Sequence, residues 1–577
     1  MKNAVLSVIL LWTVVCCGAY FYGLSEIPPY HTDENYYVES VVNMIETGDY
    51  LTPVFHDKKR FAKPILTYWL MAASYKLFGL DLASGRFWSA FLGACCPLLT
   101  FLMVRRLFDD RSAFISALIL PGIIIHFMVA RWATTDMILN FFILATFYFF
   151  IRGYQEEDRS SKNYLLAYTA MSLGFLTKGP PALLIPVLVV SIFLVLSGQW
   201  KSLIRLKPFS GIAILLAINL PWFGTMWLIH GDEFKDHILN VEIRDRLAGE
   251  APLDFYFIWS LFRYSFPWCF FLVSAMLVFF GVMSWSGENT SGNKYLAQIK
   301  NRFVKLFALE CRSILFCLLG ILVPLVLFVC LRTQHSRYLL PVFPFVAAIL
   351  GAFFVRLEKS SNWRGWILFK TPFFLSVLFY GLIALGAVTV MVFYTKIEPV
   401  PFRLGIVPFV VAFGISLLTF LFFYKKIFGI VVTLAVLQLT MLVFIFGDAL
   451  PFYSRYPMKK FKETTISLLK DDSRLAVYGL GNHRAKLGIL MGKTVYGYNE
   501  PELLLDRLDA KNISLVAMKE DDWEKEFSDE PFILVQKDIQ WKWKGEAFEV
   551  ISEIFNRGVK NKLEESTETI VLLKYVK

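Results

Sequence analysis

Acidic and basic side chains, with aromatic residues between them, occupy residues 31–64, a polar segment that separates two long apolar runs. Asp33 and Glu34 begin this segment, and a cluster of cations at 58–60 followed by Lys63 closes it. Carboxylates can manage an incoming nucleophile, and a fixed ammonium can neutralise a leaving phosphate. The segment would therefore suit a phosphorylated sugar substrate. The alternative is a solvated loop, since charged residues between two membrane spans are often no more than that.

Further polar residues recur at short turns between the apolar runs. Ionisable groups beside hydrocarbon are costly and tend to be functional. Each one alone could equally be an interfacial anchor or part of a structural ion pair. Together, cations at successive turns on the side of the acidic segment indicate an anion-binding cavity at the outer membrane–water interface. The residues concerned are Arg131, Asp136, Lys178, Arg246, Arg337 and Tyr338.

The composition defines the class of protein that must position these side chains. Hydrophobic residues make up 56% of the 577 residues and charged residues only 18%, which indicates a polytopic α-helical membrane protein. The net charge of +11 could suggest a nucleic-acid partner. However, the cations form short clusters between apolar runs, as topology signals do, so membrane lipids are expected as partners and nucleic acid is not. The eight cysteines all lie at or before Cys330, mostly in apolar runs, and imply no disulfide scaffold.

Apolar runs long enough to cross a bilayer as helices recur through the first 450 residues. The first run, Ala4–Leu24, has no convincing cleavage site and is predicted to be an uncleaved anchor. With it we count roughly thirteen transmembrane helices, an odd number that places the two chain ends on opposite sides. Basic residues gather in the loops that share a side with the N-terminus, which is therefore predicted to be cytoplasmic. The first outer loop, residues 25–86, is expected to carry amphipathic helices.

Two domains are predicted. Residues 1–450 form the transmembrane domain that carries the candidate site, and residues 451–577 have the composition of a small soluble α/β domain on the outer face. A glycine pair at Gly479-Leu480-Gly481 lacks a third glycine in register, so it predicts a turn rather than a dinucleotide loop. Expected strands are Leu475–Tyr478, Ser514–Met518, Phe532–Gln536 and Ile570–Tyr575, and expected helices are Lys459–Leu469 and Pro501–Leu508.

An ordered series of motifs resembles a known family. The chain is similar to the bacterial lipid-carrier-dependent glycosyltransferases of the GT-C fold, above all to the lipid A 4-amino-4-deoxy-L-arabinose transferases, which are relatives of the protein O-mannosyltransferases. The resemblance covers the whole chain in layout, and its motifs are dense over about the first 340 residues. They are Asp33-Glu34 with a following Tyr37, Phe61–Pro64, Thr134–Met137, Thr177–Pro180, Pro221-Trp222 and Arg337–Pro341.

The resemblance implies an inverting enzyme that takes a sugar from undecaprenyl phosphate at the periplasmic face of the bacterial inner membrane and passes it to lipid A or lipopolysaccharide. The sugar would be 4-amino-4-deoxy-L-arabinose or another amino sugar. It also implies that Asp33 acts at the reaction centre and that Lys63 holds the donor phosphate. The enzyme is expected to work as a monomer. The other implied substrate-binding residues are Glu34, Tyr37, Arg131, Asp136, Lys178, Arg246, Arg337 and Tyr338.

Three departures from the family pattern affect the expected cofactor. Ala62 replaces the usual glutamate before the motif lysine, Tyr36 replaces an arginine, and the stretch around Glu242 lacks a histidine. A divalent metal bound by that glutamate and histidine in relatives is therefore doubtful, and no metal ligand is assigned. A substitute site from His31, His56, Asp33 and Glu34 is a weaker alternative.

Two other functions stay open at this point. A lipid-linked-sugar transporter would also have many spans and a charged cavity, but it predicts internal repeats, which the sequence does not show. Within the enzyme class, the acceptor could instead be a protein or another glycan. A lipid A phosphate would arrive ionised and Asp33 would only position it, whereas a hydroxyl acceptor would need Asp33 as general base.

Overall fold

The computed structural model describes residues 2–27, 32–55, 58–156, 160–244, 255–279, 312–331, 335–359, 363–394, 401–453, 457–469, 474–480, 495–510, 512–541 and 567–576. Contacts divide the chain into two compact units. The first comprises Met1–Tyr22, Phe61–Thr67 and Trp88–Phe444, and the second comprises Gly23–Arg60, Tyr68–Phe87 and Ile445–Lys577. The domain boundary expected at residue 450 stays a prediction.

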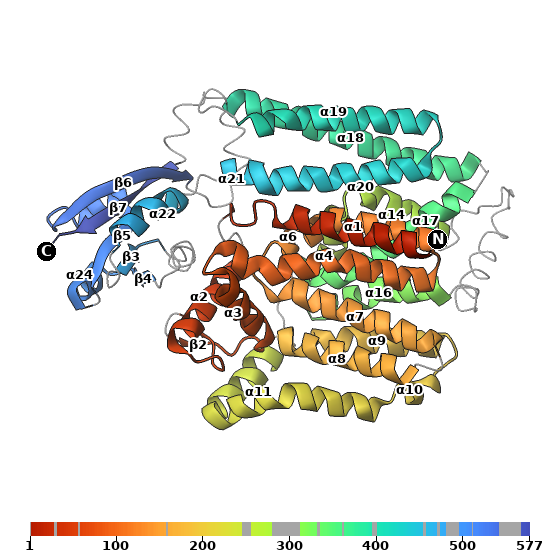
Figure 1. The fold of residues 1–577 in the computed structure, drawn as a ribbon, viewed down its shortest axis with the longest axis horizontal. Helices are drawn as coiled ribbons and strands as arrows, with labels where there is room; N and C mark the ends of the chain where they lie inside the picture. Colours follow the sequence, from red (N-terminus) through yellow and green to blue (C-terminus); the bar gives the residue numbers. More distant parts are fainter. Residues whose placement is uncertain are drawn as a thin grey trace. The chain divides into compact units, whose positions relative to one another are not determined.

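The first unit is a bundle of apolar helices. Within it α7 packs along α8, α8 along α11 and α5 along α17, and α18, α19 and α20 follow one another side by side (Figure 1). The helices are α1 (Lys2–Phe21), α4 (Leu82–Leu107, from Trp88), α5 (Asp110–Ile119), η1 (Leu120–Gly122), α6 (Ile124–Ala130), α7 (Thr135–Gln155), α8 (Ser160–Lys178), α9 (Pro181–Leu196), α10 (Ser202–Arg205), α11 (Pro208–Asp236), η3 (His237–Arg244), α13 (Tyr256–Tyr264), α14 (Trp268–Phe279), α16 (Arg312–Cys330), η5 (Ser336–Val342), α17 (Phe343–Lys359), α18 (Trp363–Tyr394), α19 (Phe402–Phe423) and α20 (Ile427–Phe444).

The expected class, a polytopic helical membrane protein, is confirmed. Among the described residues, 8 helices are long and apolar enough to cross a membrane, or up to 10 if each of two bent helix pairs counts as one span. Leu6–Phe21 and Pro181–Leu196 are shorter apolar helices. The expected count of about thirteen is not confirmed. Burial also separates two kinds of span, because α17 is almost wholly enclosed while α11, α18 and α19 expose most of their apolar side chains, as lipid-facing helices do.

The first loop of the chain belongs mostly to the second unit and contains two helices and a short hairpin. These are α2 (Thr32–Thr47), β1 (Val54–Phe55), β2 (Lys58–Lys59) and most of α3 (Leu66–Phe78), and β1 pairs antiparallel with β2. After α2 the chain turns on Asp49, whose carboxylate accepts from the backbone amides of Leu51 and Thr52. One face of α2, including Tyr37 and Val41, is buried. The predicted amphipathic helix is therefore present, and it begins at the acidic pair.

The C-terminal part of the second unit is built on a five-stranded sheet in the order β4-β3-β5-β7-β6. Neighbouring strands β4, β3 and β5 are parallel, and β7 runs antiparallel to both β5 and β6. Its elements are η6 (Ile445–Ala449), α21 (Leu450–Tyr453), α22 (Pro457–Leu468), β3 (Arg474–Tyr478), β4 (Val495–Tyr498), α24 (Pro501–Ala510), β5 (Ile513–Lys519), α25 (Glu520–Glu526), β6 (Phe532–Trp541) and β7 (Thr567–Tyr575).

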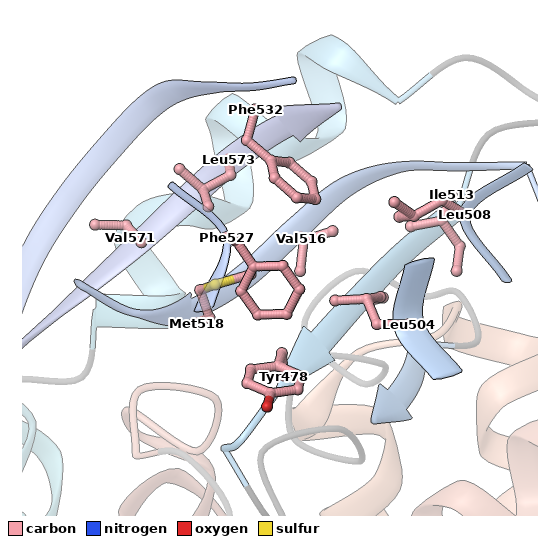
Figure 2. Close-up of a cluster of buried hydrophobic side chains, with 11 residues drawn as sticks. Tyr478, Leu504, Leu508, Ile513, Val516, Met518, Phe527, Phe532, Val571 and Leu573 are labelled. Atoms are coloured by element: carbon pink, nitrogen blue, oxygen red, sulfur yellow. The ribbon is translucent and has the colours of Figure 1, made fainter. Parts of the chain in front are cut away.

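Alternating side chains of this sheet form two buried clusters, one on each face. Leu475, Val477 and Leu515 belong to one cluster, and Ala476 and Val516 belong to the other. Figure 2 shows the second cluster, in which Phe527 lies among Tyr478, Met518 and Leu504. The expected strands and helices are all present, and β4 is an additional strand. Gly479 has a positive φ of 65° after β3. The turn predicted at Gly479-Leu480-Gly481 continues outside the described residues and stays a prediction.

Candidate active site

A buried cluster of one carboxylate and two cations lies in the first unit. Lys178 Nζ is 2.5 Å from Asp136 Oδ1, and Arg337 Nε is 3.5 Å from Asp136 Oδ2. The exposed fractions of the three side chains are 5% for Lys178, 5% for Asp136 and 9% for Arg337. The structure thus brings together three residues that the sequence placed at three separate turns.

Helix ends explain why these charges meet. Asp136 lies in the first turn of α7, after Thr134 with its extended backbone, and Lys178 is the last residue of α8. A carboxylate is favoured at a helix N-terminus and an ammonium at a C-terminus. Because α7 packs along α8 and is joined to it by a short connection, both favourable ends occur at the same side of the bundle.

Tyr338 completes the cluster. Lys178 Nζ lies 4.4 Å from the centroid of the Tyr338 ring, and the guanidinium carbon of Arg337 lies 5.8 Å from it. Lys178 and Arg337 place two cations beside the Asp136 carboxylate in a buried setting. Such a site favours an anion and disfavours a cation.

Arg131 has a different environment in the same unit. Its Nη1 donates to the carbonyl oxygens of Tyr20 at 2.8 Å and Tyr22 at 2.6 Å, and its guanidinium carbon lies 5.5 Å from the Phe127 ring. These bonds tie the turn between α6 and α7 to the end of α1. This geometry accounts for Arg131 as a structural residue, and its predicted substrate contact stays a prediction.

Lys63 is buried, and its ammonium donates to the carbonyl oxygen of Ala62 at 2.6 Å. The preceding ring of Phe61 packs against His230 and Phe234, each at a centroid distance of 5.3 Å. Those two residues flank Gly231, where α11 has a non-helical backbone with a φ of 53°. The kink in α11 therefore lies where His230 and Phe234 pack against Phe61, two residues before Lys63.

In the second unit, the acidic pair divides between two environments. Asp33 is half-buried in the first turn of α2, whereas Glu34 is fully buried. Arg86 donates to both oxygens of Glu34, from Nε at 2.8 Å and Nη2 at 2.9 Å. Adjacent helical residues point about 100° apart, which explains why only one of the two reaches this partner.

Arg86 was not singled out in the sequence because it begins an apolar run, where it resembles an interfacial anchor. Its Nη1 also donates to the carbonyl oxygens of Leu24 at 2.7 Å and Ile27 at 2.8 Å. In the sequence, the signal for Arg86 is a charged residue directly beside an apolar run. In the structure this arginine is only 2% exposed. An arginine in or near the membrane generally requires a carboxylate or carbonyl partner, and here Glu34 supplies the carboxylate.

Arg60 reaches the aromatic side of α2. Its guanidinium carbon lies 4.3 Å from the centroid of the Tyr36 ring and 5.8 Å from that of Tyr37, and its Nε donates to Tyr68 Oη at 3.3 Å. Burial lowers the pKa of Arg60, but attraction to Tyr68, Tyr37 and Asp33 outweighs it, so the pKa lies above its ordinary value. Tyr36 thus supports a guanidinium although it replaces the arginine usual in the resembling family.

Some expected site residues lie outside the described residues: His31, His56 and Arg246, together with the side chain of Glu242. Within the described part of the chain, no group of three or more His, Cys, Asp and Glu side chains could hold a metal ion. At position 62 the methyl group of alanine offers no ligand. Metal dependence therefore stays a prediction.

Comparison with known proteins places these observations in a family context. Residues 62–227, which include Lys63, Asp136 and Lys178, match the model of the dolichyl-phosphate-mannose-protein mannosyltransferase family. The expected resemblance is confirmed. An undecaprenyl phosphate-alpha-4-amino-4-deoxy-L-arabinose arabinosyl transferase of Aeromonas hydrophila is 28% identical over 394 residues, 66% of each chain. A transferase of the same name from Aeromonas salmonicida is 27% identical over 380 residues, 64% of each chain.

A solved structure shows the same fold over nearly the full length. The crystal structure of ArnT from Cupriavidus metallidurans bound to undecaprenyl phosphate covers 98% of both chains, with a TM-score of 0.73 and 17% sequence identity. The predicted fold class, a helical membrane domain followed by a small C-terminal α/β domain, is therefore confirmed. The match with the Aeromonas transferases spans just under two thirds of their length.

Proposed function

We propose that this protein is an inverting glycosyltransferase that moves a sugar from undecaprenyl phosphate to lipid A or lipopolysaccharide. The sugar is 4-amino-4-deoxy-L-arabinose or another amino sugar, as the names of the Aeromonas relatives suggest. The reaction takes place at the periplasmic face of the bacterial inner membrane, where the protein acts as a monomer. The class of enzyme is supported by the family match and by the fold.

The observation that carries the proposal is the charge cluster around Asp136. Two cations, Lys178 and Arg337, share one carboxylate inside a helical bundle, and Asp136 and Lys178 lie in the family-matching segment. A leaving phosphate needs preorganised positive charge, because negative charge grows on it as the glycosidic bond breaks. A lipid-linked donor needs no nucleotide-binding loop.

The proposed reaction breaks the bond between the sugar anomeric carbon and the donor phosphate oxygen, and that oxygen keeps the electron pair. An acceptor oxygen forms the new bond from the opposite face of the sugar, which gives inversion. Lys63 neutralises the departing phosphate, and Asp33 acts at the attacking oxygen. If the acceptor is an ionised lipid A phosphate, Asp33 positions it and no proton moves; a hydroxyl acceptor gives its proton to Asp33.

The remaining site residues other than Glu34 bind substrate in this proposal. Tyr338 and Lys178 form one wall of an anion site, since the ammonium lies over the ring. Glu34 contributes through the fold of the loop, as its pairing with Arg86 indicates. Tyr37, Arg131 and Arg246 complete the predicted substrate contacts. No metal ligand is assigned in this proposal, and Ala62 offers none.

Mass spectrometry of lipid A from cells with and without the gene tests the proposal. The added sugar should disappear from lipid A on deletion and return with the wild-type gene. The purified protein in detergent should also transfer the sugar from a defined polyprenyl-phosphate donor. Unchanged lipid A with a modified protein or other glycan would redirect the proposal to another acceptor. Transport across vesicles without any transfer in detergent would favour the transporter instead.

A further inference from the structure

Arg60 is held in place by aromatic rings rather than by a carboxylate. Its guanidinium carbon lies 4.3 Å from the centroid of the Tyr36 ring, and Tyr68 Oη accepts from Nε. A guanidinium over an aromatic ring can keep the N–H groups at the edge of its plane available for other acceptors. Of the described residues, Tyr68 alone accepts a hydrogen bond from the guanidinium, so both Nη groups keep their donors. These donors form a fork at the end of a half-buried side chain.

The surroundings of this fork favour an anion with two acceptor oxygens. Two Nη groups present parallel N–H bonds at the spacing of phosphate or carboxylate oxygens. Tyr36, Tyr37 and Tyr68 supply an apolar wall that lowers the local dielectric and strengthens such bonds. Asp33 attracts Arg60 from a distance and keeps it charged, but it occupies neither Nη group.

We propose that Arg60 binds a phosphate group through its two Nη groups, with the Tyr36 ring as its platform. This inference rests on the proposed function, which supplies two lipid sources of phosphate: the polyprenyl-phosphate donor and the phosphorylated lipid acceptor. Both present the same chemistry, a tetrahedral anion on a lipid. In either case Arg60 holds the phosphate on the same loop as Asp33, which places an anion-binding group and the candidate reaction-centre carboxylate on adjacent elements of one unit.

The competing explanation is that Arg60 only ties the hairpin to α2 and α3. A residue with that role would be replaceable by lysine, whose ammonium can also lie over Tyr36 and donate to Tyr68. Lysine could not replace an arginine that binds an anion through both Nη groups, because an ammonium does not present two parallel N–H bonds as a guanidinium does. Arg60→Lys therefore separates the two explanations even if Arg60→Ala fails to fold.

The test measures binding of two probes to the purified full-length protein in detergent: undecaprenyl phosphate, and lipid A with or without its phosphates. Arg60→Ala should weaken binding of one phosphorylated probe by about 10- to 100-fold, the range for loss of charge-assisted hydrogen bonds. Arg60→Lys should recover only a small part of this loss. Lys76→Ala is the matched control, because Lys76 also lies over a tyrosine ring, at 4.5 Å from Tyr50, but is exposed.

The affected probe identifies the source of the phosphate. Weaker binding of undecaprenyl phosphate alone assigns Arg60 to the donor, and weaker binding of phosphorylated lipid A alone assigns it to the acceptor. Wild-type affinity for both probes in Arg60→Lys overturns the inference. If the wild-type protein binds a phosphorylated probe through Arg60 but transfers no sugar, the proposed function fails and the phosphate site stands. If the wild-type protein binds neither probe, both fail.

Discussion

Glu34 and Arg86 form a buried bidentate ion pair, with Nε 2.8 Å from Oε1 and Nη2 2.9 Å from Oε2. The exposed fraction of the side chain is 0% for Glu34 and 3% for Arg86. The remaining nitrogen of Arg86 donates to the backbone carbonyls of Leu24 and Ile27. All three nitrogens of the guanidinium therefore donate to protein groups, and together they join α2, the beginning of α4 and the chain that follows α1. Because Asp33 directly precedes Glu34, the ion pair between Glu34 and Arg86 also fixes the position of Asp33.

Removing Glu34 should destabilise the protein. Glu34→Ala leaves the Arg86 guanidinium buried without its counter-charge, which typically costs about 3–5 kcal/mol of unfolding free energy. The midpoint of denaturant unfolding in detergent measures this loss. Asp110→Ala removes an exposed partner of Arg105 and should cost no more than about 1 kcal/mol. A Glu34→Ala protein as stable as the Asp110→Ala control would contradict the structural role.

Much of the fold could be predicted from the sequence because its elements have local causes. In the C-terminal sheet, β3, β5, β6 and β7 each contain a run of β-branched and aliphatic residues, and the structure places all four where the runs predict. The strand β4 was missed because Val495-Tyr496-Gly497-Tyr498 is short and contains a glycine. It is paired along its length with β3, so its conformation depends on a neighbour that local patterns do not reveal.

The site was less predictable because its contacts are not local. Asp136 and Lys178 are 42 residues apart in the sequence, and Glu34 and Arg86 are 52 apart. Charges at successive turns predicted an anion-binding cavity. Lys178 and Arg337 both contact Asp136 in the structure, and the cavity itself stays a prediction. Which carboxylate each cation would contact was not predictable, because no local pattern specifies a partner at that separation. The pairing of Glu34 with Arg86 is likewise a contact between residues far apart in the sequence.

Asp33 should matter for the rate and Glu34 for the fold. Asp33→Asn is expected to lower the transfer rate at least about 100-fold, the scale of losing a positioned acid–base or electrostatic group. Glu34→Gln should lower the rate much less per folded molecule, because its carboxylate contacts Arg86. Transfer from a defined lipid-linked sugar, at equal amounts of folded protein, gives both rates. If Asp33→Asn is active and Glu34→Gln is inactive, the reaction-centre role was assigned to the wrong carboxylate.

The predicted topology can be tested by cysteine labelling from outside the cell, in a background from which all eight native cysteines are removed. Cysteines in the loops at 105–111 and 294–305 should not react, because basic residues keep those loops cytoplasmic. A cysteine at position 483, or at the exposed position of Glu524, should react. Labelling at 300 with none at 483 or 524 would reverse the orientation.

Asp522 gives the C-terminal sheet a defined pH dependence. Burial raises the pKa of Asp522 above its ordinary value of 3.8, and repulsion by Glu526, Asp521 and Glu568 adds to this in spite of the nearby Lys519. A carboxyl group with a higher pKa in the folded chain binds its proton more tightly there. Its contribution to stability is thus fully present below pH 3.8 and is lost as the pH rises through the raised value.

Asp522→Asn, which cannot ionise, should therefore protect the sheet at neutral pH. Hydrogen exchange of the amides in β5 should be slower in this variant than in the wild-type protein at pH 7, and the difference should shrink towards pH 3.8. Asp521→Asn changes an exposed neighbouring carboxylate and should have a smaller effect. Faster exchange in Asp522→Asn than in wild type at pH 7 would show that the ionised carboxylate stabilises the domain.

The charge cluster should respond differently to loss of its anion and loss of a cation. Asp136→Asn removes the carboxylate that Lys178 and Arg337 both contact inside the bundle, so its unfolding midpoint in detergent should fall sharply, by the equivalent of about 3–5 kcal/mol. Lys178→Met leaves Asp136 paired with Arg337, so it should lose less stability. Because one of the two cations beside Asp136 is lost, its KM for the lipid-linked donor should rise about tenfold or more. Lys235→Met, at an exposed ion pair, should change neither quantity appreciably. An unchanged KM in a well-folded Lys178→Met protein would remove the cluster from the substrate site and leave it a purely structural role.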